Sequence, residues 1–226
     1  MADEYRAKTG GAFDPRIGGL TRLWGFHGDS PRIPSRAEID AERNSTDHEL
    51  DFGGIGKGMA AERAGMELIR RGVRSALINL GGNIQSVGAP PDGQYWTIAV
   101  VHPRKTDEAV AFLLLPPGHA VATSGDYERF LFDADGKRFH HILDPLTGYP
   151  AERSDTDAKI VSVTIQSPSA TAADAWSTGA FVLGWPEGFS RVEEEPDLEG
   201  LFVLEHEDGR IELRKTSGMR IEAKTR

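Results

Sequence analysis

A glycine-rich loop that leads directly into a helix is the feature of this sequence that most constrains its fold. Residues 51–58 read DFGGIGKG, and small or apolar side chains then form one stripe at i, i+4 and i+8 over positions 60–69. This spacing predicts a helix with a close-packing face that ends near Gly72. The loop has two interpretations: a tight strand-to-helix turn with glycines at positive φ, or a backbone cradle for an anion, to which Lys57 adds a full charge. Its glycine spacing fits neither the P-loop nor the dinucleotide-binding pattern.

Apolar runs bounded by turn signals predict strands along much of the chain. SALINL is predicted to be a buried strand that IQSVG continues after a turn or bulge at GGN. YWTIAVV, HAVATSG and KIVSVTI are predicted to be strands as well. The pairs Asp135-Gly136 and Asp208-Gly209 lie between apolar runs and predict two hairpin turns.

A second helix and two irregular segments complete the predicted fold. AADAWSTGAFVLG predicts a helix whose N-cap is Ser169 or Thr171. Residues 11–36 predict a structured loop with one short amphipathic turn, and residues 30–50 predict a polar, exposed segment. This order of elements predicts an α+β fold, a mostly antiparallel sheet with packed helices, in one domain over residues 1–226.

The composition excludes several classes of function. The chain carries 26 basic and 35 acidic residues, a net charge of −9, which disfavours nucleic acid and acidic membranes as partners. It has no cysteine, so disulfides, thiolate metal sites and cysteine nucleophiles are excluded. The sequence contains no window of ~18 apolar residues for a membrane span and no recognisable secretion signal.

Three oxygen-bearing side chains occur within about one turn of the second predicted helix. Asp174 and Thr178 are four residues apart, with Ser177 between them, so all three are expected on one helix face. An ordinary polar face, or a threonine bonded back to its own helix, is the simpler explanation. Hard oxygen ligands of this kind suit Mg²⁺ when a substrate phosphate completes the site. The magnesium hypothesis therefore requires a phosphate nearby.

Two adjacent histidines, His140 and His141, precede the segment ILDPLTGYP. Neighbouring strand residues point to opposite faces, so at most one of the two is expected to face a site. With Asp144 close in sequence, that histidine is a candidate oriented general base or phosphate ligand, and a structural role is the alternative. The seven histidines show no zinc-binding spacing.

Six motifs occur along the chain in the order GAFDP, DFGGIGKG, INLGGN, TSGDYERF, HHILDPLTGYP and ADAWSTGAFVLG. Together they resemble the ApbE family of FAD:protein FMN transferases, and the resemblance runs from about Gly10 to Gly184. Members of that family cleave the diphosphate of FAD with Mg²⁺, transfer FMN to a Thr or Ser hydroxyl of a target flavoprotein, and release AMP. The resemblance therefore implies Mg²⁺ as cofactor, FAD as substrate and a flavoprotein as partner.

The resemblance also implies roles for individual residues. Implied contacts to FAD fall on Ala12, Phe13, Asp14, Asp51, Lys57 and Ile142. Implied metal ligands are the carbonyl of Gly54 and the side chains of Asp174 and Thr178, with Ser177 where some members carry an aspartate ligand. His141 matches the catalytic-site histidine, and Asp174 is expected to serve catalysis through the metal.

The family pattern also includes an N-terminal segment with a Met-Gly-Thr stretch, often behind an export or lipoprotein signal. This sequence matches none of it, and three explanations stay open: a misassigned start, a separate N-terminal chain, or a reduced form. In a reduced form, an open sheet edge would favour pairing with another chain, for instance in a homo-oligomer. Family members mostly act outside the cytoplasm, so the localisation of this chain is left open.

Three functions are compatible with these motifs. The first is Mg²⁺-dependent transfer of FMN to a protein hydroxyl, and the second is Mg²⁺-dependent hydrolysis of FAD to FMN and AMP. The third is FAD binding without catalysis. The motifs neither identify the target flavoprotein nor distinguish Mg²⁺ from Mn²⁺.

Overall fold

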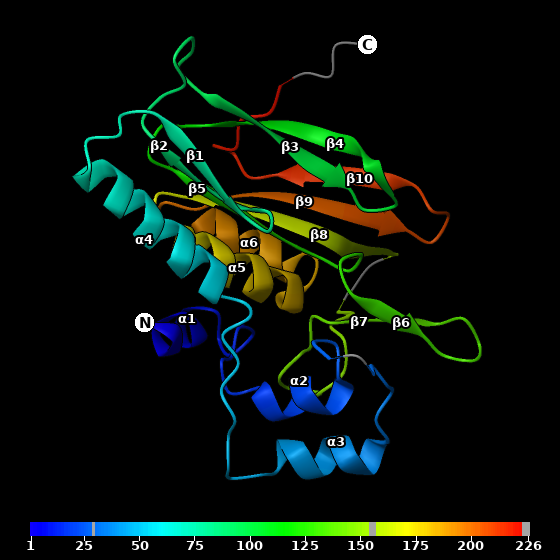
Figure 1. Cartoon of the computed structure of the whole chain (residues 1–226). Helices are drawn as coiled ribbons and strands as arrows, with labels where there is room; N and C mark the ends of the chain where they lie inside the picture. Colours follow the sequence, from blue (N-terminus) through cyan, green and yellow to red (C-terminus); the bar gives the residue numbers. More distant parts are fainter. Residues whose placement is uncertain (29, 154–156, 223–226) are drawn as a thin grey trace.

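The computed structural model describes residues 1–28, 30–153 and 157–222 (Figure 1). The helices are α1 (Ala2–Lys8), α2 (Gly18–Trp24), α3 (Arg36–Arg43), α4 (Gly56–Arg70), α5 (Ala170–Leu183) and α6 (Glu187–Glu194). The strands are β1 (Ala76–Leu80), β2 (Asn83–Val87), β3 (Trp96–His102), β4 (Lys105–Leu115), β5 (Ala120–Gly125), β6 (Phe130–Phe132), β7 (Arg138–His140), β8 (Ala158–Ser167), β9 (Glu199–His206) and β10 (Ile211–Lys215).

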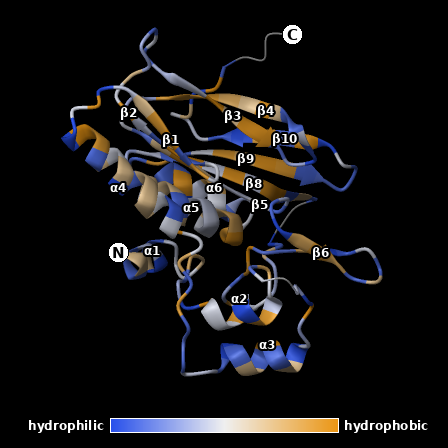
Figure 2. Ribbon diagram, viewed as in Figure 1, coloured by the Kyte–Doolittle hydropathy of each residue, from blue (hydrophilic) through white to orange (hydrophobic). Residues whose placement is uncertain are grey.

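Six strands form one antiparallel sheet in the order β1-β2-β5-β8-β9-β10. Helices α4, α5 and α6 lie against one face, and the β3–β4 hairpin lies over the other (Figure 1). Strand β8 is buried along nearly its whole length because both of its faces are covered. Figure 2 shows the matching pattern, with apolar residues concentrated in β3, β4, β8 and β9.

Helix α5 lies at the centre of the core. It is apolar on nearly every side and is buried between the sheet, α4 and α6. Ser169 caps the helix by accepting a hydrogen bond from the N–H of Ala172, and Glu62 of α4 accepts one from the N–H of Thr171. The few polar side chains of α5 therefore stand on a rigid, well-anchored element.

A smaller layer lies below these helices and consists of α2, α3, the β6–β7 hairpin and the loop at 141–150 (Figure 1). Its core packs Leu20, Trp24 and Ile39 against Leu143. The indole N–H of Trp24 donates to the carbonyl of Gly148 at 2.9 Å. Segments more than a hundred residues apart thus form one unit.

The α+β prediction is confirmed, as are both long helices and both predicted hairpins. Gly136 and Gly209 have φ of 80° in the turns that join β6 to β7 and β9 to β10. Helix α5 begins after Ser169, one of its two predicted caps. No described helix has both the length and the apolar character needed to cross a membrane.

The strands predicted at SALINL and IQSVG are confirmed as β1 and β2, and GGN forms the turn that was one of its two interpretations, but the predicted continuation and burial were wrong. The chain does not continue from one to the other but reverses at Gly81-Gly82, so that Leu80 pairs with Asn83. Strand β1 is also not buried: it is the edge of the sheet, and Leu77 is 41% exposed. An edge strand with apolar residues on both faces has the same local sequence as a central one.

Four elements were not predicted: α1, α3, α6 and β4. The first half of β4 is polar and exposed, which hides its strand period. Helix α3 lies in the segment expected to be polar and exposed, and it begins with a capping box between Ser35 and Glu38.

Candidate active site

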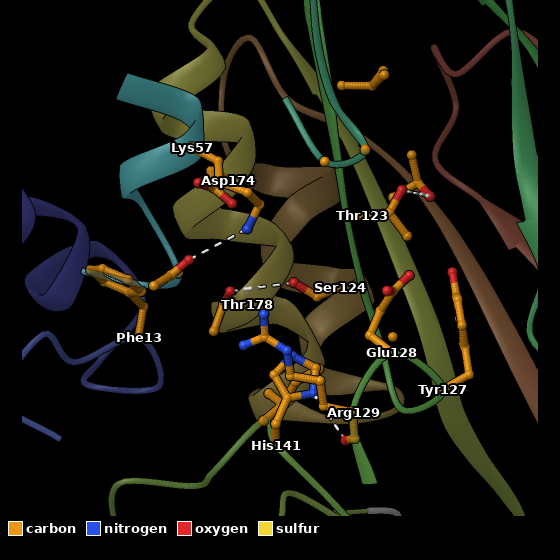
Figure 3. Close-up of a pocket in the computed structure, with 18 of the residues that line it drawn as sticks. Phe13, Lys57, Thr123, Ser124, Tyr127, Glu128, Arg129, His141, Asp174 and Thr178 are labelled. Atoms are coloured by element: carbon orange, nitrogen blue, oxygen red, sulfur yellow. Dashed lines mark hydrogen bonds between the residues drawn. The ribbon is translucent and has the colours of Figure 1, made fainter. Parts of the chain in front are cut away.

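One cavity of about 570 Å³ is lined by the glycine loop, α5, the sheet and the lower layer. Ten predicted site residues line it: Ala12, Phe13, Asp14, Asp51, Gly54, Lys57, His141, Ile142, Asp174 and Thr178. Another part of the lining is apolar and includes Ile84, Ile98 and Val121. The cavity therefore offers both an apolar and a polar surface to a ligand. Figure 3 shows the polar side chains, among them Lys57, Asp174 and Thr178.

The glycine loop fixes Asp174 through the first turn of α4. The backbone N–H of Gly58 donates to Oδ2 of Asp174 at 2.8 Å. A Cβ at Gly58 would lie only 2.2 Å from the carbonyl oxygen of Ala170, so glycine is required for α4 to approach α5 this closely. Neither a preceding strand nor a positive φ is found at the loop glycines 53, 54, 56 and 58, so the strand-to-helix interpretation was wrong.

This hydrogen bond has a second consequence, at Gly54. In a regular helix the N–H of Gly58 would donate to the carbonyl four residues earlier. Because it donates to Asp174 instead, the carbonyl of Gly54 accepts no hydrogen bond within the described structure. A Cβ at Gly54 would lie 3.0 Å from Oγ1 of Thr178, so this backbone lies close to that hydroxyl. Asp174, Thr178 and Gly54 thus bring oxygen atoms to one part of the cavity.

Ser177 does not line the cavity, unlike the other predicted site residues. It is fully buried, its Oγ donates to the carbonyl of Asp174 at 2.8 Å, and it lies 2.9 Å from Oγ of Ser124 on β5. The back-bonding considered for Thr178 is therefore made by Ser177.

The adjacent histidines point to opposite sides, as predicted. His140 is buried against Phe181 with its Nε2 3.1 Å from the carbonyl of Ala151, whereas His141 lines the cavity. Nδ1 of His141 lies 3.3 Å from the carbonyl oxygen of Arg129, which also accepts the backbone N–H of His141 at 3.0 Å. A carbonyl only accepts, so the neutral ring carries its proton on Nδ1 and leaves a lone pair on Nε2.

Burial, together with the smaller effect of His140, lowers the pKa of His141 to about 4, although the hydrogen bond to the carbonyl of Arg129 opposes this shift. His141 is therefore neutral at neutral pH. Asp144 does not orient it, contrary to the prediction: Oδ2 of Asp144 accepts from the guanidinium of Arg153 at 2.8 Å. The carbonyl of Arg129 orients the ring instead.

The predicted FAD-contacting residues form walls of the same cavity. Phe13 is buried under the glycine loop against Ile55 and Ala175. Oδ2 of Asp14 accepts from Nε of Arg6 at 2.6 Å, and Oδ1 of Asp51 accepts from the N–H of Gly53 at 2.7 Å. Ile142 and Ala12 are also buried and line the cavity. Contacts of these side chains with FAD stay predictions.

Two cationic side chains reach the cavity. Nζ of Lys57 lies 3.5 Å from the carbonyl of Gly53 and pairs with no carboxylate in the described part of the chain. Arg129 lines the cavity beside His141 (Figure 3). Its guanidinium contacts the ring of His27. Sequence reasoning assigned no role to Arg129 or Ser124, although both lie in the TSGDYERF motif. The charges suit an anionic ligand such as a diphosphate.

The oxygen atoms suit a divalent cation that is shared with a substrate. Within residues 1–28, 30–153 and 157–222, no three His, Asp or Glu side chains gather at one point. Asp174 offers one carboxylate, and Thr178 and Gly54 offer neutral oxygens. Mg²⁺ is commonly held by one or two carboxylates together with substrate phosphates and water. The donor set therefore fits Mg²⁺ completed by a phosphate.

The fold and cavity define an α+β protein with a pocket that is partly apolar and partly lined by oxygen atoms and cationic side chains. Among known families, the model of the ApbE family matches residues 1–202 of this chain. The chain therefore belongs to the ApbE family.

Individual relatives agree with this assignment. The chain is 37% identical over 218 residues to a FAD:protein FMN transferase of Klebsiella pneumoniae and 34% identical over 220 residues to that of Escherichia coli K12, each match covering 87% of this chain. The ApbE protein of Thermotoga maritima superposes with a TM-score of 0.82 at 36% identity, covering 96% of this chain and 73% of its own. The apo form of flavinyl transferase ApbE of Pseudomonas stutzeri superposes with a TM-score of 0.77 at 31% identity, covering 96% of this chain and 70% of its own. The chain spans 65% of the Klebsiella protein and 60% of the Escherichia coli protein.

Proposed function

We propose that this chain transfers FMN from FAD to a Thr or Ser hydroxyl of a target flavoprotein in a Mg²⁺-dependent reaction that releases AMP. One observation carries the proposal: Asp174, Thr178 and the free carbonyl of Gly54 meet in a cavity that also contains a neutral histidine. The relatives described as FAD:protein FMN transferases support the same reaction class.

The cation site supports the first part of this reaction. Asp174, Thr178 and Gly54 would hold Mg²⁺, which would neutralise charge on the diphosphate of FAD. Lys57 and Arg129 supply further positive charge on the same cavity lining. The apolar lining with Ile98 and Val121 suits the aromatic part of the substrate.

His141 supports the second part. The acceptor hydroxyl oxygen attacks the phosphorus of the FMN half, the bond from that phosphorus to the bridging oxygen breaks, and AMP leaves. The hydroxyl proton passes to Nε2 of His141, which is free because Nδ1 is fixed by the carbonyl of Arg129. The lowered pKa keeps the ring unprotonated before the step.

The test is to incubate the protein with FAD, Mg²⁺ and a candidate flavoprotein, and to measure AMP and covalent flavin fluorescence in a denaturing gel. The transferase gives both products in equal amounts. AMP without labelled protein would replace the proposal with FAD hydrolysis, and neither product would leave FAD binding alone.

Asp174→Asn is the decisive variant, and Asp107→Asn, on the exposed part of β4, is its matched control. We expect Asp174→Asn to lower the rate of AMP release by at least a hundredfold, with the control unchanged. Release of AMP at the wild-type rate by Asp174→Asn would refute the metal assignment.

A further inference from the structure

A chain of three hydroxyl groups connects the cavity to the interior of α5. Oγ1 of Thr178 lies 3.3 Å from Oγ of Ser124, which lies 2.9 Å from Oγ of Ser177. Oγ of Ser177 lies 2.8 Å from the carbonyl oxygen of Asp174. Figure 3 shows Ser124 on β5 reaching across to Thr178 on α5.

The end of this chain fixes the direction of every hydrogen bond in it. The carbonyl of Asp174 can only accept, so Ser177 must use its single proton there. The contact between Ser124 and Ser177 then uses the proton of Ser124. Ser124 has no second proton, so the contact with Thr178 uses the proton of Thr178. Oγ1 of Thr178 is left with lone pairs alone for the cavity.

We infer that Ser124 is a positioning residue that makes Thr178 an acceptor-only oxygen, ready to bind the divalent cation. The inference rests on the proposed function, because it concerns the same cation site. It also gives Ser177 a role although that residue does not line the cavity: its buried hydroxyl sets the polarity of the chain.

Removal of the Ser124 hydroxyl would free the proton of Thr178. A helical threonine with a free proton donates to a carbonyl of its own preceding turn, or points the proton outward. The first orientation turns the lone pairs of Oγ1 away from the direction they have when the proton points to Ser124, and the second places the proton where the cation would bind, so each would weaken the bond from Oγ1 to a cation. Groups that orient a metal ligand typically affect metal affinity by about 10–100-fold, which sets the size of the expected effect.

The experiment measures binding of Mn²⁺ to the full chain by electron paramagnetic resonance, in the presence of saturating ADP as an unreactive diphosphate. We expect Ser124→Ala to weaken Mn²⁺ binding about 10–100-fold. Ser124→Thr keeps the hydroxyl and should bind Mn²⁺ within about threefold of the wild type. Ser86→Ala is the control: it removes another part-buried serine hydroxyl of the same sheet, bonded to the carbonyls of Pro116 and His119.

A second readout separates positioning from a loss of structure. AMP release by Ser124→Ala should recover when Mg²⁺ is raised, because the rate constant at saturating metal is retained while the metal requirement increases. If Ser124→Ala binds Mn²⁺ as tightly as the wild type while Asp174→Asn has lost affinity, the inference about Ser124 is overturned and the cation site is not. Unchanged affinity in Asp174→Asn as well would overturn the cation site and the proposed function with it.

Discussion

Gly58→Ala should lower the free energy of unfolding and weaken Mn²⁺ binding. Gly56→Ala, two residues earlier in α4, should do neither. A Cβ at position 58 would lie 2.2 Å from the carbonyl oxygen of Ala170, where ordinary contact begins at 3.4 Å. Helix α4 would have to move away from α5 by about 1 Å. At Gly56 the nearest atom would be 3.9 Å away, in Phe52, so the added methyl has room.

The magnitude follows from three contributions. Overpacking costs about 1–3 kcal/mol, and loss of the N–H bond to the buried carboxylate of Asp174 adds about 1.5–3 kcal/mol. The better helix propensity of alanine returns about 1 kcal/mol. We therefore expect Gly58→Ala to lower the free energy of unfolding by about 1.5–5 kcal/mol and to weaken Mn²⁺ binding, because the displaced helix also carries the Gly54 carbonyl away.

Urea denaturation of the two variants measures this difference, with unchanged slopes required for the comparison. The Gly56→Ala protein should be as stable as the wild type or more stable, and should bind Mn²⁺ normally. Equal stability and equal Mn²⁺ affinity in both variants would show that close approach at Gly58 is not what holds Asp174.

Three further predictions concern stability. Arg104→Met should cost about 3–5 kcal/mol in urea denaturation, because Arg104 binds the buried Asp126 through two bonds of 2.7 and 2.8 Å, and a loss below about 1 kcal/mol would contradict this. Ser35→Ala should cost about 1 kcal/mol by breaking the capping box of α3, a loss that the thermal midpoint would reveal, and an unchanged midpoint would contradict it. The pKa of His141 is about 4 in the folded protein, below the value of 6.5 that applies to the unfolded chain. The stabilisation that requires a neutral His141 is therefore complete above about pH 6.5 and is lost as the pH falls toward 4. Wild type should therefore lose about 2–3 kcal/mol more than His141→Gln over that range, and parallel pH profiles of the two proteins would refute the shift.

The sequence predicted the long elements because their signals are local. Helix α5 combines an apolar run with the N-cap Ser169, and the Asp-Gly turns fix two hairpins within a few residues. What failed depends on distant partners. Whether SALINL is buried depends on whether another strand lies on each side of it. No residue within 75–80 indicates that this strand is at the edge of the sheet.

The site was predictable as a set of residues, and its internal connections were not. The motifs gave ten residues that line one cavity. Their spacing could not reveal that Gly58 holds Asp174, that Arg153 takes Asp144 away from His141, or that Ser177 is turned inward. The first bond joins groups 116 residues apart, and the other two arrangements depend on how the surrounding elements pack, as the contact of Ser177 with Ser124 on β5 shows. The capping box at Ser35 is different: its signal was present in the sequence and would have predicted α3.

The bond between Trp24 and Gly148 has a consequence for the order in which the chain folds. It closes a loop of 124 residues, and closing so long a loop costs entropy that local hairpins such as β6–β7 do not lose. The lower layer, which lines part of the cavity, should therefore dock after the local hairpins have formed. A ligand that touches both the glycine loop and His141 binds only the docked state and adds its binding free energy to that state. Under the proposed function FAD is such a ligand and would stabilise the docked layer, so saturating FAD should slow proteolysis within residues 44–50, which link α3 to the glycine loop.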